Sequence, residues 1–174
     1  MRVFLAGASG VIGRRIAELL LADGHVVVGT TRSGDNVDSL RALGIEPVVC
    51  DVYDLPRLTE VVRASAPDLV MHQLTDLPDD VAEIREYGSG NARIRREGTA
   101  NLITAARAAG TPRVLVQSVA FPVPGDGAVA VAEMEEAVLA ANGVVVRYGQ
   151  FYGPGTYHAH RPEGEAAHEH EHSG

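Results

Sequence analysis

Three evenly spaced glycines near the amino terminus restrict the fold of this chain more than any other feature. Gly7, Gly10 and Gly13 lie in a loop that follows the apolar run Val3–Ala6 and precedes a helical pattern over Val11–Ala22. A strand, a glycine-rich loop and a helix in this order are typical of a site that binds a nucleotide cofactor, because the start of a helix presents free N–H groups to an anion. A purely structural turn is the alternative interpretation.

Each small residue of this loop has its own expected task. Gly7 permits a tight turn, and a small residue at Ser9 or Gly10 lets the backbone approach a pyrophosphate. Gly13 lets the helix lie close to the strand, and the first helical N–H groups face the anion. The residues that we expect to hold the dinucleotide here are Gly7, Ser9, Gly10, Val11, Ile12 and Gly13.

Apolar runs alternate with helical patterns along most of the chain. We expect strands at Val3–Ala6, Val26–Thr30, Ile45–Cys50, Leu69–His72, Arg113–Gln117 and Val144–Tyr148. We expect helices at Val11–Ala22, Val37–Leu43, Leu55–Ala64, Asn91–Ala109 and Val129–Ala141. The strands are apolar throughout, as in a parallel sheet that is covered on both faces. The pattern predicts an α/β chain with a doubly wound parallel-sheet Rossmann fold and the strand order 3-2-1-4-5-6.

The chain has 174 residues, which is enough for one domain with a sizeable core. We expect a Rossmann-type dinucleotide-binding domain over residues 1–157, followed by a short irregular tail over residues 158–174 that is rich in His and Glu. A solvated tail is the favoured interpretation and weak metal binding the alternative, so no metal site is predicted. The tail histidines are His158, His160, His168, His170 and His172.

Composition narrows the range of partners. The formal net charge is -8, which argues against a nucleic-acid-binding surface because phosphate contacts require clustered positive charge. No apolar run approaches the length of a membrane span and the first residues lack a signal-peptide layout, so we expect a soluble, cytoplasmic protein with a small-molecule substrate. The single cysteine, Cys50, rules out an internal disulfide. We interpret Cys50 as a small buried hydrophobe, with a reactive thiol as the alternative.

The residues after the second strand favour one dinucleotide over the other. An NAD site would place Asp or Glu here to bind the ribose 2′-hydroxyl, whereas this chain has Thr31, Arg32 and Ser33. A guanidinium can fork onto a 2′-phosphate, with the two hydroxyls as further donors. The sequence therefore predicts NADP as the cofactor and makes NAD less favoured; a solvated arginine is the alternative interpretation of Arg32.

The spacing of the glycines, with Ala6 before them and Arg14 after them, resembles the loop of the short-chain dehydrogenase/reductase superfamily. The likeness is to its extended and atypical branches, which include NAD(P)-dependent epimerases and dehydratases and NmrA-like proteins. Arg147 followed by Tyr-Gly-Pro-Gly at 152–155 is similar to the sixth strand and following loop of extended members. The resemblance covers residues 1–157 and implies a homodimer formed through the helices at 91–109 and 129–141.

The resemblance also implies roles for single residues. Asp51 is expected to face the adenine amino group, with the backbone N–H of Val52 beside the ring; a turn-forming aspartate is the alternative. Ser118, at the end of the fifth strand, is expected to hold an oxygen of the substrate. His72 stands where family members place small residues, and it is either an acid or base, with an ordinary pKa near 6.5, or a hydrogen-bonded structural histidine.

The sequence departs from the family's catalytic pattern at one place. Extended members carry Tyr-x-x-x-Lys after the fifth strand, but this chain contains no lysine and residues 129–136 contain no tyrosine. Extended members also continue into a substrate lid, which we expect to be missing here. The standard acid–base mechanism is therefore absent. Tyr148 and Tyr152 are the nearby phenols that remain as proton donors, with a packing role as the alternative.

These patterns together predict a function class. We expect an NADP(H)-binding oxidoreductase or epimerase-like enzyme that acts on a small carbonyl or alcohol substrate. Its nonstandard catalytic site would draw on Ser118, Tyr148, Tyr152 and His72. The alternatives are a non-redox isomerase, cyclase or dehydratase on the same scaffold, and an NmrA-like binding module that senses dinucleotides.

Overall fold

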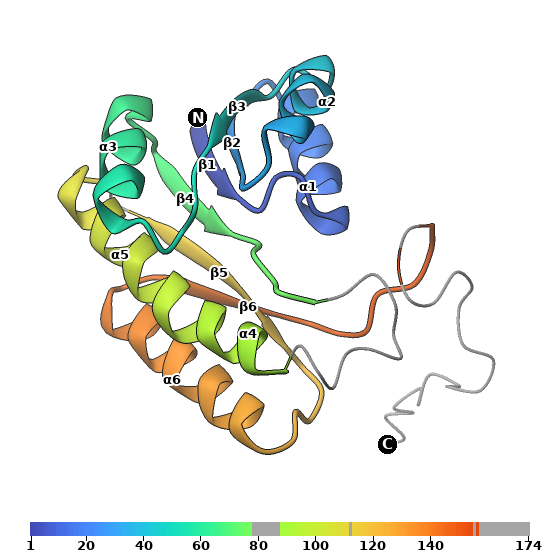
Figure 1. Cartoon of the computed structure of the whole chain (residues 1–174), viewed down its shortest axis with the longest axis vertical. Coiled ribbons are helices and arrows are strands. Elements are labelled where there is room, and N and C mark those ends of the chain that lie inside the picture. The colour runs from blue at the N-terminus through green and yellow to red at the C-terminus, as the bar shows by residue number, and fades with distance from the viewer. Residues whose placement is uncertain (78–87, 112, 155, 157–174) are drawn as a thin grey trace, which may run out of the picture.

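The computed structural model describes residues 1–77, 88–111, 113–154 and 156, and within them a single parallel sheet is flanked by helices (Figure 1). Its strand order is β3-β2-β1-β4-β5-β6. The strands are β1 (Arg2–Ala6), β2 (Val26–Thr31), β3 (Glu46–Val49), β4 (Leu69–His72), β5 (Val114–Val119) and β6 (Val144–Tyr148). All pairings are parallel, which confirms the predicted doubly wound Rossmann fold.

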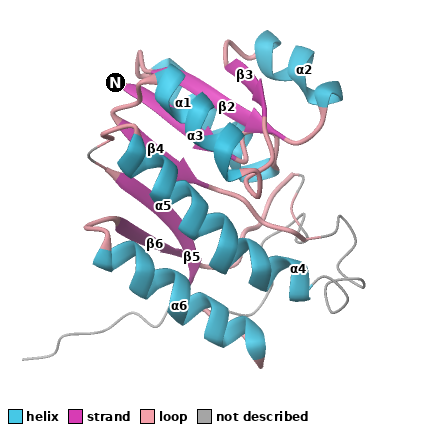
Figure 2. Cartoon of the chain, turned by 60° about the vertical axis from the view of Figure 1, so that its left-hand side comes forward, coloured by secondary structure: helices cyan, strands magenta, loops and turns pink. Residues whose placement is uncertain are grey.

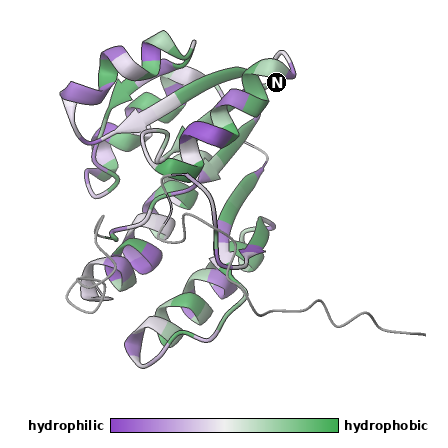
Figure 3. Cartoon of the chain, turned by 90° about the vertical axis from the view of Figure 1, so that its right-hand side faces the viewer, coloured by the Kyte–Doolittle hydropathy of each residue, from purple (hydrophilic) through white to green (hydrophobic). Residues whose placement is uncertain are grey.

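The helices fall into two groups, one on each face of the sheet (Figure 1), and Figure 2 views the molecule with the group of α3, α5 and α6 turned forward. They are α1 (Val11–Ala22), α2 (Val37–Ala42), α3 (Leu55–Ser65), α4 (Gly88–Arg93), α5 (Thr99–Ala108) and α6 (Asp126–Ala140). The face with α3, α5 and α6 buries Phe4 and Val116 against Leu102, and the face with α1 and α2 buries Leu5 and Leu40. Figure 3 shows the strands between these layers as mostly hydrophobic.

The register of the central strands brings the expected site residues to one edge of the sheet. β1 lies between β2 and β4, with Leu5 opposite both Gly29 and Met71. The carboxyl ends of these strands therefore lie side by side, which is where ligands bind in open parallel sheets. The glycine loop, the turn after Thr31 and the residues after His72 all begin at this edge.

The sequence predicts that helices cover both faces of the sheet, but one face of β5 and β6 is partly exposed. In β5 the buried residues Val114, Val116 and Ser118 alternate with half-exposed ones, and Val144 in β6 is exposed. The reason is that α5 and α6 pack on one face of β5 and α6 packs on β6, while α1 and α2 lie over the other half of the sheet. Among the described helices, none packs on the second face of β6.

The helix predicted over residues 91–109 is not continuous. It starts three residues earlier, as α4, and a π-helical turn, Ile94–Gly98, separates α4 from α5. A Cβ at Gly98 would lie 3.3 Å from the Ile94 side chain and 3.4 Å from Val52. The glycine therefore allows a close approach where the helix widens, and such π-turns often occur at functional sites.

The structure bears on the expected absence of a membrane span but not on the expected C-terminal tail. In the ranges that the structure describes, no helix is long and apolar enough to cross a membrane. The His- and Glu-rich tail at 158–174 lies outside the described residues, so the domain boundary at 157 stays a prediction.

Candidate cofactor-binding site

The loop between β1 and α1 has the shape that its glycines predict. Gly7 has a φ of +91°, and a Cβ there would lie 2.8 Å from the carbonyl group of Gln73. A Cβ at Gly13 would lie 2.0 Å from the carbonyl oxygen of Gly7, so only glycine lets α1 approach the loop this closely. Gly10 caps α1 without a side-chain hydrogen bond, which leaves the first N–H groups of the helix available.

Side chains from neighbouring elements hold this loop in place. The backbone N–H of Gly7 donates to the Thr30 hydroxyl at 3.3 Å. Arg14 donates to the carbonyl oxygen of Ser9 at 3.0 Å and to the Ser39 hydroxyl at 3.1 Å. The loop is therefore ordered by contacts that leave its outer surface open.

A cavity lies over the loop at the carboxyl edge of the sheet. Of the expected cofactor residues, it is lined by Gly7, Ser9, Gly10, Thr31, Arg32 and Val52. The other lining residues are Ala6, Thr30, Cys50, Tyr53, Leu58, Gln73, Leu74, Thr75 and Ile94. The expected residues that lie outside the lining are Val11, Ile12, Gly13, Ser33 and Asp51.

The loop after β2 presents the guanidinium of Arg32 to the cavity. The Thr31 hydroxyl donates to the carbonyl oxygen of Ser33, and the Ser33 hydroxyl accepts from the backbone N–H of Asp35. Both hydroxyls therefore stabilise the turn, so their predicted role as phosphate donors requires the turn to rearrange. Arg32 is different, because its side chain is 57% exposed and its partner is a single carboxylate oxygen of Asp76, at 3.5 Å.

The turn after β3 forms the far wall of the cavity. Asp51 accepts from the backbone N–H of Tyr53 at 2.9 Å, which is the turn-forming role of the two that the sequence left open. Cys50 is buried, and this burial raises the pKa of its thiol to about 11. The thiol therefore stays protonated, as expected of a small buried hydrophobe.

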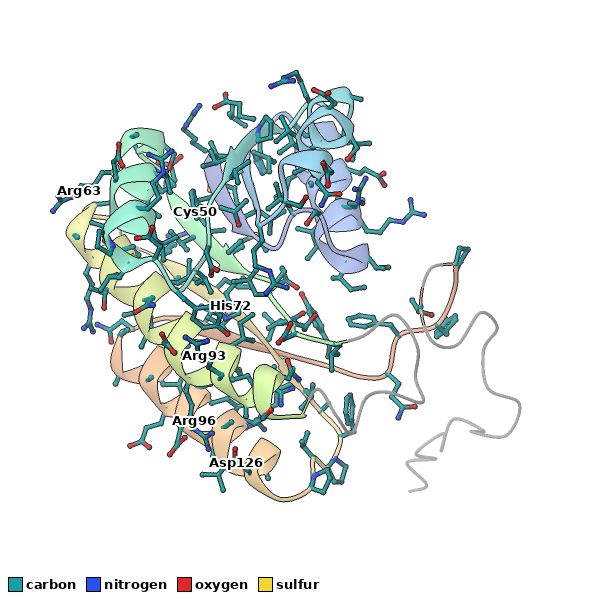
Figure 4. All side chains as sticks on the ribbon, in the orientation of Figure 1. Cys50, Arg63, His72, Arg93, Arg96 and Asp126 are labelled. Atoms are coloured by element: carbon teal, nitrogen blue, oxygen red, sulfur yellow. The ribbon has the colours of Figure 1, made fainter. Side chains whose placement is uncertain are left out.

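Tyr53 brings an aromatic ring and a second arginine to this wall. The Arg93 guanidinium lies 3.8 Å from the centre of the Tyr53 ring, and Arg93 also pairs with Glu97 at 2.7 Å. Burial raises the pKa of the Tyr53 phenol, and Arg93 partly opposes this rise. Figure 4 shows Arg93 projecting from α4. The sequence analysis missed both residues, because nothing in their local pattern indicates that α4 passes beside the turn after β3.

His72 is a structural histidine in this arrangement. Its side chain is 1% exposed, and Nδ1 accepts from the backbone N–H of Leu74 at 3.1 Å. Nε2 therefore carries the proton of the neutral ring, and this buried N–H has no hydrogen-bond partner among the described residues. Burial lowers the pKa of His72 to about 4, so the ring is uncharged at neutral pH. Figure 4 places it at the end of β4.

Of the two expected phenols, Tyr148 contacts a residue of the cavity lining, although neither phenol lines the cavity itself. Tyr148 accepts a long hydrogen bond, 3.5 Å, from the Gln73 amide, and Gln73 lines the cavity. The Tyr148 ring packs on Phe151 with 5.2 Å between the ring centres. Tyr152 is exposed, and no contact of its hydroxyl is present among the described residues.

Ser118 points away from the cavity and into an ion-pair cluster. Its hydroxyl donates to Glu135 of α6 at 2.5 Å, and Arg147 of β6 donates to both oxygens of the same carboxylate, at 2.9 and 2.5 Å. The Glu135 side chain is only 12% exposed, and the hydrogen bond from Arg147 holds its pKa below the usual value. Ser118 is thus bound to a carboxylate, and its predicted contact with a substrate oxygen requires this bond to break.

The residues around the cavity suit a dinucleotide. A Cβ at Gly10 would meet nothing closer than the carbonyl oxygen of Gly7 at 3.4 Å, so no other side chain fills the space beside Gly10. The uncapped start of α1 suits a pyrophosphate, and Arg32 suits a further phosphate. In the part of the chain that the structure describes, no group of three His, Cys, Asp or Glu side chains is placed to hold a metal.

A family model described as the NAD dependent epimerase/dehydratase family matches residues 3–139. The chain belongs to this family. A 3-diazoavenalumate denitrifying reductase from a Streptomyces species is 38% identical over 183 aligned residues, which cover 91% of this chain and 59% of that protein. The UDP-glucose 4-epimerase of Mycolicibacterium smegmatis is 32% identical over 124 residues, which cover 66% of this chain and 37% of that protein.

Solved structures of epimerase/dehydratase family members share the fold. The UDP-glucose 4-epimerase of Thermus thermophilus, in complex with NAD, superposes with a TM-score of 0.72 at 25% identity, covering 88% of this chain and 57% of that one. The chain thus spans about half the length of such relatives. The resemblance to the extended short-chain dehydrogenase/reductases is confirmed, and it supports a nicotinamide dinucleotide as the cofactor.

Proposed function

We propose that the chain binds NADP(H) in the cavity over the glycine loop and acts as a reductase of a small substrate. The observation that carries the cofactor preference is Arg32, an exposed guanidinium on the cavity wall at the end of β2. The turn that carries it places two hydroxyl residues, Thr31 and Ser33, where an NAD site would need a carboxylate. Gly10 and the first N–H groups of α1 would hold the pyrophosphate.

Titration calorimetry with NADPH and NADH tests the preference. Arg32→Ala should remove most of the difference, because a lost charge-assisted contact costs about 1.5–3 kcal/mol, or about tenfold to a hundredfold in affinity. Arg41→Ala is the matched control, since Arg41 is an exposed arginine that pairs with Asp38 on the nearby α2. Equal affinities of the unmodified chain for the two dinucleotides would refute the preference.

The arrangement around Ser118 bears on the reaction. Reduction of a carbonyl group needs a proton for the new alkoxide, yet the lysine that would lower a phenol pKa is absent and the Ser118 hydroxyl is bound to Glu135. Tyr148 accepts a hydrogen bond from the Gln73 amide, and it is then the phenol that would supply this proton. General acid–base assistance is worth about 10²–10⁴-fold, so a site without a tuned acid suits a substrate that needs none.

An aryl diazonium group is such a substrate, and it is our leading candidate for the substrate class. The relative at 38% identity is named as a denitrifying reductase of a diazo compound. When bound, the reduced nicotinamide supplies a hydride. Overall, the C–N bond breaks, a C–H bond forms, dinitrogen leaves with the bonding electron pair, and no further proton is consumed. The chain's own residues would then bind and orient the substrate without proton transfer.

The assay follows NADPH consumption with a simple aryldiazonium salt and, separately, with a matched aromatic aldehyde. We expect turnover of the diazonium salt to survive Tyr148→Phe and Tyr152→Phe, and to fall to the uncatalysed rate in Gly10→Val. If only the aldehyde is reduced and Tyr148→Phe abolishes that activity, the carbonyl reductase is the correct function. Tight NADPH binding with no turnover of either compound would favour the dinucleotide-sensing module.

A further inference from the structure

The ion pair between Arg32 and Asp76 joins a residue of the cavity lining to the residue that follows Thr75, another residue of that lining. Arg32 follows β2, Asp76 follows β4, and β1 with its glycine loop lies between these strands. A dinucleotide on the glycine loop extends across the same carboxyl edge of the sheet. The contact between the two side chains therefore lies at the position where the cofactor's phosphate-bearing ribose and Arg32 would meet.

Asp76 is the fixed member of the pair. Its backbone N–H donates to the Asn91 side chain at 3.3 Å, and its Oδ2 fills the space beside Gly90, where a Cβ would lie 2.1 Å from that oxygen. Its side chain is 31% exposed, compared with 57% for Arg32. Asp76 thus has a defined position against α4, whereas Arg32 is the more exposed side chain of the pair.

The contact is too weak to satisfy the guanidinium. It is a single 3.5 Å approach from Nη2 to Oδ1, whereas a guanidinium has five N–H donors and makes its strongest contacts with oxyanions in pairs near 2.8 Å. Glu97 is already paired with Arg93, and among the described acids Asp76 is the one that forms an ion pair with Arg32. Asp76 is therefore the described carboxylate that competes with a phosphate for Arg32.

We propose that Asp76 sets how strongly the cavity discriminates between phosphorylated and unphosphorylated dinucleotides, by competing with the 2′-phosphate for Arg32. This inference rests on the proposed role of Arg32 as the 2′-phosphate ligand. The 2′-phosphate displaces the Asp76 carboxylate from Arg32 and stays repelled by it, so Asp76 lowers the affinity for NADPH. NADH carries no group that takes part in this exchange, so its affinity does not depend on Asp76.

The test compares calorimetric affinities of wild type and Asp76→Asn for NADPH and NADH, and for the fragments 2′,5′-ADP and 5′-ADP. Asparagine keeps the shape beside Gly90 and removes the charge. We expect Asp76→Asn to bind NADPH and 2′,5′-ADP about twofold to tenfold more tightly, as expected for losing one exposed ion pair and one repulsion, with NADH and 5′-ADP unchanged. In an Arg32→Ala background, Asp76→Asn should have no effect.

Two further variants separate the competition from general effects of charge. Gly90→Ala keeps the net charge but pushes the Asp76 carboxylate from its position, so it should strengthen NADPH binding as Asp76→Asn does. Asp38→Asn removes one charge from α2, away from the cavity, and should change neither affinity.

Each outcome decides the inference separately from the cofactor preference. Equal gains for NADPH and NADH would mean a general charge effect, and equal losses would mean that Asp76 binds a ribose hydroxyl; either result overturns the inference. If wild type prefers NADPH and Asp76→Asn leaves its affinity unchanged, the inference fails while the preference stands. If wild type shows no preference and Asp76→Asn creates one, the preference fails while the inference stands.

Discussion

Acid should destabilise this fold through His72. The ring is fully buried and uncharged, with a pKa lowered to about 4 by burial, whereas the unfolded chain holds the same ring at its ordinary value near 6.5. Between these two values the unfolded state binds a proton that the folded state does not. The stabilisation is therefore complete above pH 6.5 and is lost as the pH falls toward 4.

The size of the effect follows from the two pKa values. Each pH unit inside the window changes the free energy of unfolding by about 1.4 kcal/mol, so His72 should account for a loss of about 2 kcal/mol between pH 7 and pH 5. Urea unfolding followed by far-ultraviolet circular dichroism at several pH values in this range measures it. His72→Asn keeps an acceptor for the backbone N–H of Leu74, so we expect a less stable protein whose stability is nearly independent of pH here.

His25→Gln serves as the control, because His25 lies near the amino terminus and bonds the terminal amine in an exposed position. This variant shows what replacing an exposed histidine does to the stability. If the slope for His72→Asn equals that of wild type between pH 7 and pH 5, then His72 does not titrate as a buried neutral ring and the reasoning is wrong.

The remaining predictions concern the glycine loop, the ion-pair cluster and the assembly. Gly10→Val should fold with a near-normal melting temperature but lose dinucleotide binding by calorimetry, because its side chain would occupy the pyrophosphate space; wild-type affinity would show that the loop does not hold a phosphate. Gly13→Ala should instead lower the melting temperature strongly, since its Cβ would meet backbone atoms at 2.0 Å, and an unchanged melting temperature would contradict that geometry. Ser118→Ala should leave the pH profile of activity from 6 to 10 unchanged, because Ser118 bonds Glu135; a shifted profile would return it to the reacting atoms. The predicted homodimer is tested by Leu139→Glu, because Leu139 is an apolar residue of α6 that is 60% exposed. The new charge should shift elution in size-exclusion chromatography from dimer to monomer. Elution at the same volume would contradict an interface at α6.

The fold could be predicted because its signals are local. The glycine loop and the alternating apolar runs determine the strand order, and the bounds of α1, β4 and β6 agree with the expected ones. The interruption of the helix after residue 93 could not be predicted, since a π-turn has no composition of its own and depends on contacts such as those of Gly98 with Val52.

The part of the candidate site that could be predicted consists of residues within short local motifs, namely the glycine loop and the turn after β2. Gly7, Gly10 and Arg32 line the cavity as the motif indicates. The other side depends on tertiary contacts, and there the sequence was less informative. Ser118 faces Glu135, because it shares the strand face of Val116, and that face is covered by helices. Such an orientation follows from which face α6 occupies, and that is visible only when the sheet is assembled.

The π-helical turn fixes the rotational phase of α4. Successive residues of an α-helix point about 100° apart, so a segment that contains one residue more than a regular helix rotates everything on its amino-terminal side by that angle relative to α5. With this phase, Arg93 stacks on Tyr53 and Asn91 bonds the backbone of Asp76. Deleting one residue from Ile94–Gly98 would keep every side chain on that stretch of α4 and yet turn both contacts away from the cavity. Which side chains of α4 face the cavity thus depends on the number of residues in the π-helical turn as well as on their identities.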